Sequence, residues 1–334
     1  MADPEHGAGM KRRDFIAALG GVAAMPLAAR AQPAMPVVGF LHPSSPEPFQ
    51  HIVNGFRQGL NDTGFVENQS VMVEYRWARG AYDRLPSLAG ELVQRRVRVL
   101  LAGGGEIGAQ AAKSATSTIP ILIIPSSDPV KSGLVASFSR PEGNVTGLMT
   151  ATSILEAKKF GLLCEMVPKA RTIAMLINPD YPPHAADTIE VQSAAQSIGR
   201  QLIVLKANSP QTIDSAFEVI VAQRAQALLV GGDPFLVGRS QQIIAMTARH
   251  LIPAIYDFRE AATAGGLMTY GASLPNNYRQ LGTYAGRILK GEKVGDLPIM
   301  HPAKFDFVIN LITAKALNLD VPPGLSARAD EIIE

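Results

Sequence analysis

Short apolar runs alternate with amphipathic stretches along most of this chain. Runs of four to six apolar residues predict buried strands, and apolar residues that recur every three or four positions predict helices with one buried face. The predicted strands are 37–41, 71–77, 97–102 and 119–124, then 173–178, 202–206, 227–230 and 254–256. The predicted helices are 49–60, 85–95, 109–114 and 129–137, then 154–167, 185–198, 213–223, 238–250, 277–289 and 314–317. Strands that alternate with helices indicate an α/β fold with parallel sheets.

The pattern occurs twice. The apolar run at 37–41 ends in His42-Pro43, and the run at 173–177 ends in Asn178-Pro179. Two further pairs, at 100 and 228 and at 119 and 252, recur in the same order. The separations are 136 (37 to 173), 128 (100 to 228) and 133 residues (119 to 252). We therefore expect two similar Rossmann-like lobes, and a cleft between lobes is a common place for a ligand.

A second repeat suggests where the chain passes between the lobes. Gly-Leu-Met-Thr occurs at 147–150 and again at 266–269. We interpret both as crossings, so that 36–149 with 268–292 forms lobe 1 and 150–267 forms lobe 2. Residues 293–334 then hold a third crossing and a C-terminal tail. The alternative is that the two tetrapeptides are coincidental edge strands.

The first 31 residues have the features of an export signal. Lys11-Arg12-Arg13 precedes a moderately apolar stretch, and Ala29-Arg30-Ala31 has the form of a cleavage site. The paired arginines resemble a twin-arginine signal, with residues 1–9 as an extension. We expect cleavage near Ala31 and a mature protein in the periplasm. The alternative is an ordinary amphipathic N-terminal helix.

Composition narrows the possible functions. The chain has 334 residues, 47% of them apolar and 18% charged, which fits a globular protein of two lobes. A net charge of +2 gives no electrostatic reason to expect nucleic acid. Cys164 is the single cysteine, so neither an internal disulfide nor a cysteine-based metal site is expected.

The candidate chemistry lies in the loops that follow the strands, because the carboxyl ends of parallel strands meet at one edge of a sheet. Serine hydroxyls and helix N-termini suit a carboxylate, and Asp128 or Asp233 suits an ammonium group. The alternatives are that Ser44 only caps a helix, that both aspartates are turn residues before proline, and that Arg259 is a surface charge. The candidate ligand-binding residues are Ser44, Ser45, Gly104, Glu106, Ser126, Asp128, Asn178, Tyr181, Asp233, Phe235, Tyr256 and Arg259.

One motif points to a different class of protein. The stretch 103–108 matches G-x-G-x-x-G, follows a predicted strand, and has Asp128 twenty residues beyond it. This is the fingerprint of a dinucleotide site, so an exported nicotinamide-dependent oxidoreductase is the alternative function. Against it, the fingerprint normally follows the first strand of the fold, whereas this one follows the third. The six histidines show no metal-ligand spacing.

Several short motifs occur together along the chain. They are Tyr75-Arg76-Trp77-Ala78, Tyr82-Asp83-Arg84-Leu85-Pro86, Ser127-Asp128-Pro129-Val130, Gly143-Asn144-Val145-Thr146-Gly147 and Val308-Ile309-Asn310. With these motifs the chain resembles the ABC-transporter substrate-binding proteins of the tryptophan-binding-like group, and the resemblance covers essentially all of the mature chain. It implies a type I periplasmic binding fold with three crossings, capture of a solute by hinge closure, and delivery to a membrane permease with a cytoplasmic ATPase.

These observations favour a monomeric solute-binding protein without catalysis or cofactor, whose ligand is a small organic solute such as an amino acid or an aromatic carboxylate. The effector half of a transcription regulator has a similar fold. The export signal and the lack of a preceding helix-turn-helix argue against that third class.

Overall fold

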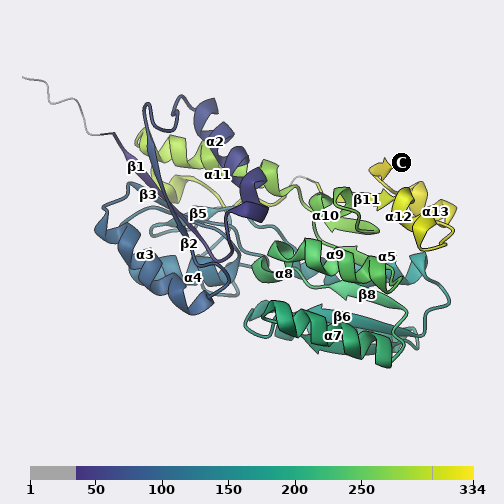
Figure 1. Cartoon of the computed structure of the whole chain (residues 1–334). Coiled ribbons are helices and arrows are strands. Elements are labelled where there is room, and N and C mark those ends of the chain that lie inside the picture. The colour runs from purple at the N-terminus through teal and green to yellow at the C-terminus, as the bar shows by residue number, and fades with distance from the viewer. Residues whose placement is uncertain (1–34, 303) are drawn as a thin grey trace, which may run out of the picture. The chain divides into compact units, whose positions relative to one another are not determined.

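The computed structural model describes residues 35–302 and 304–334 (Figure 1). The expected export signal lies outside the described residues. From Pro36 onward the chain forms one compact unit that contains two sheets. Among the described residues, no helix is long and apolar enough to cross a membrane.

The first lobe is built on a five-stranded parallel sheet in the order β2-β1-β3-β4-β5. Residues alternate between its two faces: Phe40 and Leu101 pack against α2 and α11, while Leu41 and Leu100 pack against α3 and α4. Both faces are therefore covered, which explains why the strands are apolar throughout. The elements are β1 Val37–His42, η1 Glu47–Phe49, α2 Gln50–Asp62, β2 Met72–Trp77, η2 Tyr82–Arg84, α3 Leu85–Gln94, β3 Val99–Ala102, α4 Glu106–Ala115, β4 Ile121–Ile123, β5 Val145–Gly147, α11 Leu274–Leu289 and η4 Val294–Asp296.

The second lobe is built on a seven-stranded sheet in the order β12-β11-β10-β9-β8-β6-β7, in which only the β10–β11 pair is antiparallel among the described strands. Its elements are η3 Ser153–Leu155, α5 Glu156–Met166, β6 Thr172–Ile177, α6 Pro183–Ser197, β7 Gln201–Lys206, α7 Pro210–Ala222, β8 Ala227–Val230, α8 Pro234–Gly238, α9 Ser240–Arg249, β9 Ala254–Tyr256, α10 Arg259–Thr263, β10 Met268–Gly271, β11 Asp306–Asn310, α12 Leu311–Ala316, α13 Pro323–Ser326 and β12 Glu331–Ile333.

The predicted duplication is confirmed in the sheets. The order β2-β1-β3-β4 of the first lobe recurs as β7-β6-β8-β9 in the second. In both lobes the first strand lies second from one edge of the sheet and is parallel to both neighbours: β1 pairs with β2 and β3, and β6 pairs with β7 and β8. The fold is thus two Rossmann-like α/β lobes, as the sequence predicts.

The crossings differ in part from the expected positions. The first follows β5, where Met149 donates its backbone N–H to Met300 at 2.9 Å. The second Gly-Leu-Met-Thr is no crossing, because Met268–Gly271 is strand β10 of the second sheet. The return to lobe 1 begins after Gly271, and the tail from Asp306 joins the second sheet as β11 and β12. Met268 is fully buried on this strand. The repeated tetrapeptide in the sequence does not show whether it forms a strand or a crossing.

The predicted helix at 129–137 is also wrong, because the segment forms turns. Asp128 accepts hydrogen bonds from the backbone N–H groups of Val130 and Lys131. Gly133 then takes a φ of +71°, which ends any helical path. The apolar residues Leu134 and Val135 are buried in the core of lobe 1, so their spacing reflects loop packing.

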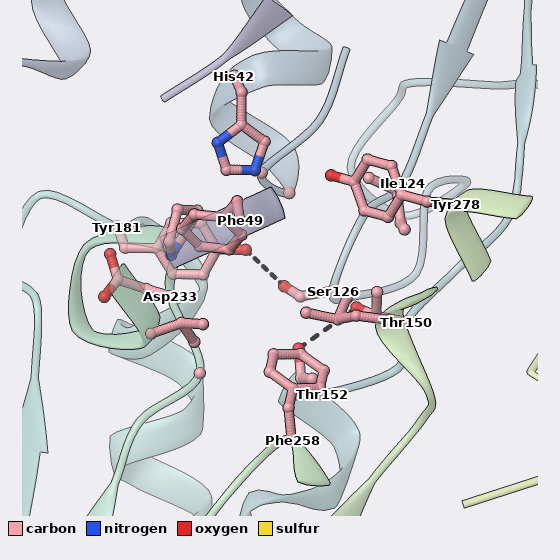
Figure 2. A pocket seen from close by; sticks show the side chains of 16 residues that line it. His42, Phe49, Ile124, Ser126, Thr150, Thr152, Tyr181, Asp233, Phe258 and Tyr278 are labelled. Atoms are coloured by element: carbon pink, nitrogen blue, oxygen red, sulfur yellow. Dashed lines mark hydrogen bonds between the residues drawn. The ribbon is translucent and has the colours of Figure 1, made fainter. Parts of the chain in front are cut away.

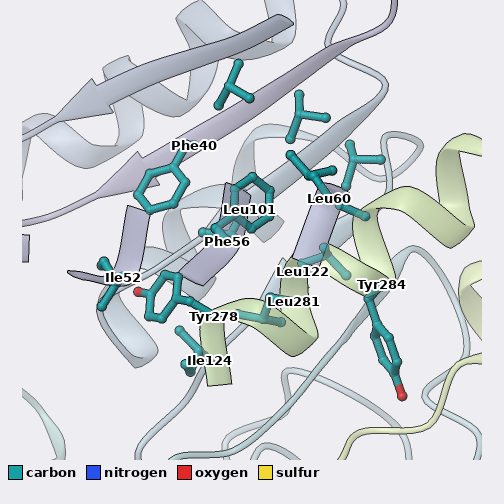
Figure 3. Packing of buried hydrophobic residues seen from close by; sticks show 14 of the residues in the cluster. Phe40, Ile52, Phe56, Leu60, Leu101, Leu122, Ile124, Tyr278, Leu281 and Tyr284 are labelled. Carbon is teal, nitrogen blue, oxygen red and sulfur yellow. The ribbon is translucent and has the colours of Figure 1, made fainter. Parts of the chain in front are cut away.

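Helix α11 is fixed to lobe 1 by backbone contact with α2 (Figure 3). A methyl group at Gly59 would overlap the carbonyl oxygen of Arg279, and one at Gly282 would overlap that of Phe56. Glycines at these positions let the two helices approach closely. The close contact places Leu281 of α11 in the core beside Leu60 of α2.

Gly59→Ala should lower the free energy of unfolding by about 1–3 kcal/mol, because the added methyl group forces the two helices apart. Denaturant unfolding measures this. Gly90→Ala in α3 is the matched control: nothing lies within 4 Å of the added Cβ, so stability should stay the same or rise slightly. Equal losses in the two variants would contradict the close helix contact.

Candidate functional site

A cavity lies between the lobes at the carboxyl ends of their strands (Figure 2). The space between the lining residues, part of it open to solvent, is about 440 Å³. Both lobes and the first crossing supply its walls. The lining residues are His42, Phe49, Gly104, Gly105, Ile124, Ser126, Thr150, Thr152, Tyr181, Gly232, Asp233, Pro234, Val237, Phe258, Leu274 and Tyr278.

The cavity has an aromatic end and a polar end. Figure 2 shows His42, at the end of β1, with Phe49 and Tyr278 at one end. Ser126, Thr152 and Asp233 lie toward the other end, with Phe258 beneath. Asp233 is the one charged side chain among these lining residues. The cavity therefore suits a small molecule with a flat apolar body and a polar, partly cationic head.

Two tyrosines, Tyr181 buried and Tyr82 half-buried, join the lobes across the cavity wall. Tyr82 of lobe 1 donates its hydroxyl proton to Asp233 Oδ2 at 2.6 Å, and Asn178 Nδ2 donates to the same oxygen at 2.7 Å. Tyr181 of lobe 2 lies between Glu106 Oε2, at 2.7 Å, and Ser126 Oγ, at 2.8 Å. Each lobe supplies one tyrosine, so hydrogen bonds join the two lobes on both sides.

Burial, followed by the nearby carboxylates of Asp233 and Glu106, raises the pKa values of Tyr82 and Tyr181 well above the usual range. Both phenols are therefore protonated at neutral pH and donate to carboxylate oxygens. Hydrogen bonds to charged acceptors are the stronger kind, and both of these bonds are partly buried.

The glycine-rich turn at 103–108 is explained by close packing, both within lobe 1 and against lobe 2. Gly104 and Gly105 have φ values of +76° and +78°, which favour glycine. A methyl group at Gly104 would collide with Pro43, and one at Gly105 would collide with the Tyr181 hydroxyl. The Glu106 carboxylate occupies the start of α4 and accepts the backbone N–H of Ser127 at 2.7 Å. A carboxylate at that position disfavours a pyrophosphate, so the nicotinamide alternative finds no support here.

Some of the residues expected to bind ligand border the cavity, and others hold those residues in place. Gly104, Ser126, Tyr181 and Asp233 line it. Glu106 and Asn178 lie one step behind, hydrogen-bonded to Tyr181 and Asp233.

The remaining candidates lie elsewhere. Ser44, Ser45 and Phe235 border a separate hollow between the lobes. Asp128 caps its own turn, and Tyr256 is buried in the core of lobe 2, where its hydroxyl meets Thr247 at 3.2 Å. Arg259 is half exposed and pairs with Glu331. Asp128 and Arg259 thus match the alternatives of turn residue and surface charge. Ser44 does not match the alternative of a helix cap, because the helix that follows it has Pro46 at its N-cap and no side-chain cap; the backbone N–H of Ser44 donates to His42.

Several lining residues were not among the candidates. Thr150 and Thr152 come from the crossing, and Leu274 and Tyr278 come from α11, which follows the second lobe in sequence. Phe49 lies on the apolar face of a predicted helix, and a residue at such a position is expected to pack in the hydrophobic core and not to contact a ligand. His42 and Phe258 stand in loops that the strand-end rule does identify, but neither has a motif that separates it from a solvated loop residue.

A buried ion cluster supports the loop that carries Asp233. Lys159 is fully buried and donates to Asp257 Oδ1 at 2.6 Å and to Glu156 Oε1 at 2.9 Å. Burial alone lowers the pKa of Lys159, but the carboxylates of Asp257 and Glu156 outweigh it and raise that pKa. Glu156 also accepts the backbone N–H of Gly232 at 3.2 Å. The cluster therefore fixes the backbone directly before Asp233.

The two lobes have the type I periplasmic binding fold, which the chain shares with solved structures. The chain belongs to the ABC transporter substrate binding protein family, whose model matches residues 13–333.

Individual relatives agree with this assignment. The chain is 26% identical over 269 residues to the tyrosine-binding protein of Clostridioides difficile (strain R20291), covering 79% of this chain and 76% of that protein. It is similar to a conserved domain protein from Vibrio cholerae, with a TM-score of 0.81, 23% identity, and coverage of 89% and 99%. It is also similar to an ABC domain from Streptococcus pneumoniae in complex with L-Trp, with a TM-score of 0.79, 21% identity, and coverage of 89% and 99%.

Asp187 should make stability depend on pH. It is buried on α6, accepts a hydrogen bond from Ser153, and burial followed by the charge of Glu156 raises its pKa from 3.8 to about 8. A carboxyl group whose pKa is raised on folding contributes its full stabilisation at pH values below its pKa in the unfolded chain. This contribution is lost as pH rises from about 4 to about 8. Within this range the free energy of unfolding falls by up to about 1.4 kcal/mol per pH unit.

Urea unfolding of Asp187→Asn should therefore show a flatter profile than the native protein between pH 5 and pH 8, and the variant should gain relative stability at the upper end. Asp320→Asn, at an exposed position, is the control and should follow the native profile. Parallel profiles for the native protein and Asp187→Asn would show that Asp187 does not carry this pH dependence.

Proposed function

We propose that this protein is the solute-binding component of an ABC importer and that it captures an amino acid with an aromatic side chain in the interlobe cavity. The observation that carries the proposal is the cavity itself, with aromatic side chains at one end and hydroxyls and a single carboxylate at the other. No catalytic step and no cofactor are needed for this role.

The ammonium group and the carboxylate group of such a ligand each have a partner in the cavity. Asp233 is 1% exposed and lines the cavity, where its carboxylate suits an ammonium group. The Thr152 hydroxyl at the polar end suits a carboxylate; it lies 3.4 Å from the Thr150 hydroxyl, which itself donates to the backbone oxygen of Pro125 at 3.2 Å. The ring would lie against Phe49 and Tyr278 at the aromatic end, where flat apolar surface is available.

The relatives support the same ligand class. One is named a tyrosine-binding protein, and another was solved in complex with L-Trp. Both ligands are zwitterions with an aromatic side chain, which matches the two ends of the cavity.

We propose hinge closure as the mechanism of capture. The segments 36–147 with 274–300, and 152–271 with 306–333, would move as two bodies about the three crossings. Ligand would bridge the bodies and stabilise the closed form, whose tyrosine contacts join them.

Family membership supports a position outside the cytoplasm and delivery to a membrane permease with its ATPase. We propose export through the N-terminal segment, with cleavage near Ala31, and function as a monomer in the periplasm. The arginine pair at 12–13 favours the twin-arginine route.

A panel of amino acids tests the function. Aromatic L-amino acids at a hundred times their Kd should stabilise the purified protein by about 2.7 kcal/mol and raise Tm by several degrees. Aliphatic, basic and acidic amino acids at the same concentrations should not. A Tm that responds to none of the aromatic amino acids would refute the proposal.

Asp233→Asn should raise the Kd for the aromatic ligand at least tenfold in calorimetric titration, because the ammonium group loses its ionic partner. Asp128→Asn is the matched control. Its side chain caps a turn away from the cavity, so its Kd should stay near the native value. Unchanged affinity in both variants would remove the ammonium assignment.

A further inference from the structure

The aromatic end of the cavity contains one polar group without a protein partner among the described residues. His42 is 2% exposed, and its Nδ1 accepts the backbone N–H of Ser44 at 3.2 Å. Nδ1 is thereby an acceptor, so the ring proton lies on Nε2. Burial, assisted by the charge of His51, lowers the pKa of His42 to about 3. The imidazole is therefore neutral under ordinary conditions, with one acceptor satisfied and one donor left.

The remaining donor faces the cavity. The His42 ring lies against Phe49, with ring centres 4.6 Å apart, and against Trp77 at 5.0 Å. Figure 2 shows the ring directed between Phe49 and Tyr278. Tyr278 reaches the same corner: a methyl group at Gly103 would lie 2.6 Å from its hydroxyl oxygen and 2.7 Å from His42 Cδ2.

We propose that the Nε2–H group of His42 recognises the far end of the ligand's ring and selects a ring that carries a hydrogen-bond acceptor, such as the phenolic oxygen of tyrosine. The inference rests on the proposed function and names its specificity-determining residue. The ligand class is a 4-hydroxyphenyl amino acid, in preference to one with an unsubstituted phenyl or an indole ring.

The discrimination follows from hydrogen-bond chemistry. A phenolic oxygen accepts from Nε2–H, whereas a phenyl ring leaves that buried donor unpaired. An indole N–H is a donor only, so it opposes the histidine donor and cannot replace the phenol. A site that hydrogen-bonds a substrate hydroxyl rejects the analogue that lacks it, and here we expect a preference of about ten- to a hundredfold.

Calorimetric titration of the native protein with L-tyrosine, L-phenylalanine and L-tryptophan is the first test. Tyrosine should bind about ten- to a hundredfold more tightly than phenylalanine, and the ratio should stay constant between pH 6 and pH 8 because His42 does not titrate there. This comparison needs no variant. Equal affinities for tyrosine and phenylalanine would overturn the inference while leaving the proposed function intact.

His42→Leu is the second test and should bring the ratio of phenylalanine Kd to tyrosine Kd close to one. His51→Leu is the matched control, because His51 is near His42 but does not line the cavity, and it should keep the native ratio. A native ratio in His42→Leu would assign the selection to another group. Failure of all three amino acids to bind the native protein would overturn both the proposed function and this inference.

Discussion

The contact between the lobes depends on hydrogen bonds that a tyrosine of each lobe makes to a carboxylate of the other. Tyr82 donates to Asp233, and Tyr181 donates to Glu106, in a region that is partly shielded from water. A buried polar group without a partner costs about 1–3 kcal/mol, so these bonds favour the arrangement in which the lobes meet. Gly105 follows from this constraint, because a methyl group there would collide with the Tyr181 hydroxyl of the opposite lobe.

The two cavity walls are held rigid by different means. In lobe 1, the contact between α2 and α11 brings Tyr278 to the site through glycines that allow the helices to touch. In lobe 2, the buried Lys159 between Asp257 and Glu156 fixes the loop before Asp233. Preformed walls reduce the ordering that a ligand must bring about on binding, which favours affinity.

Sequence patterns predict the fold well and the site in part. The spacing and length of the apolar runs predict the strands. The two halves of the sequence are similar, so they predict two similar lobes and a cleft between them. The strand-end rule identifies Asp233 and Tyr181 because their loops must lie at the cleft. It cannot say which loop residue faces inward, so Tyr256 and Arg259 were included although packing turns one into the core and the other to solvent. Tyr278 was missed because its position depends on a long-range helix contact.

The central claim is that ligand holds the two lobes closed. Small-angle X-ray scattering of the purified protein, with and without saturating L-tyrosine, tests it most directly. The account predicts a larger radius of gyration without ligand, and with ligand a profile that matches the closed structure. Binding of tyrosine with no change in the scattering profile would contradict the claim.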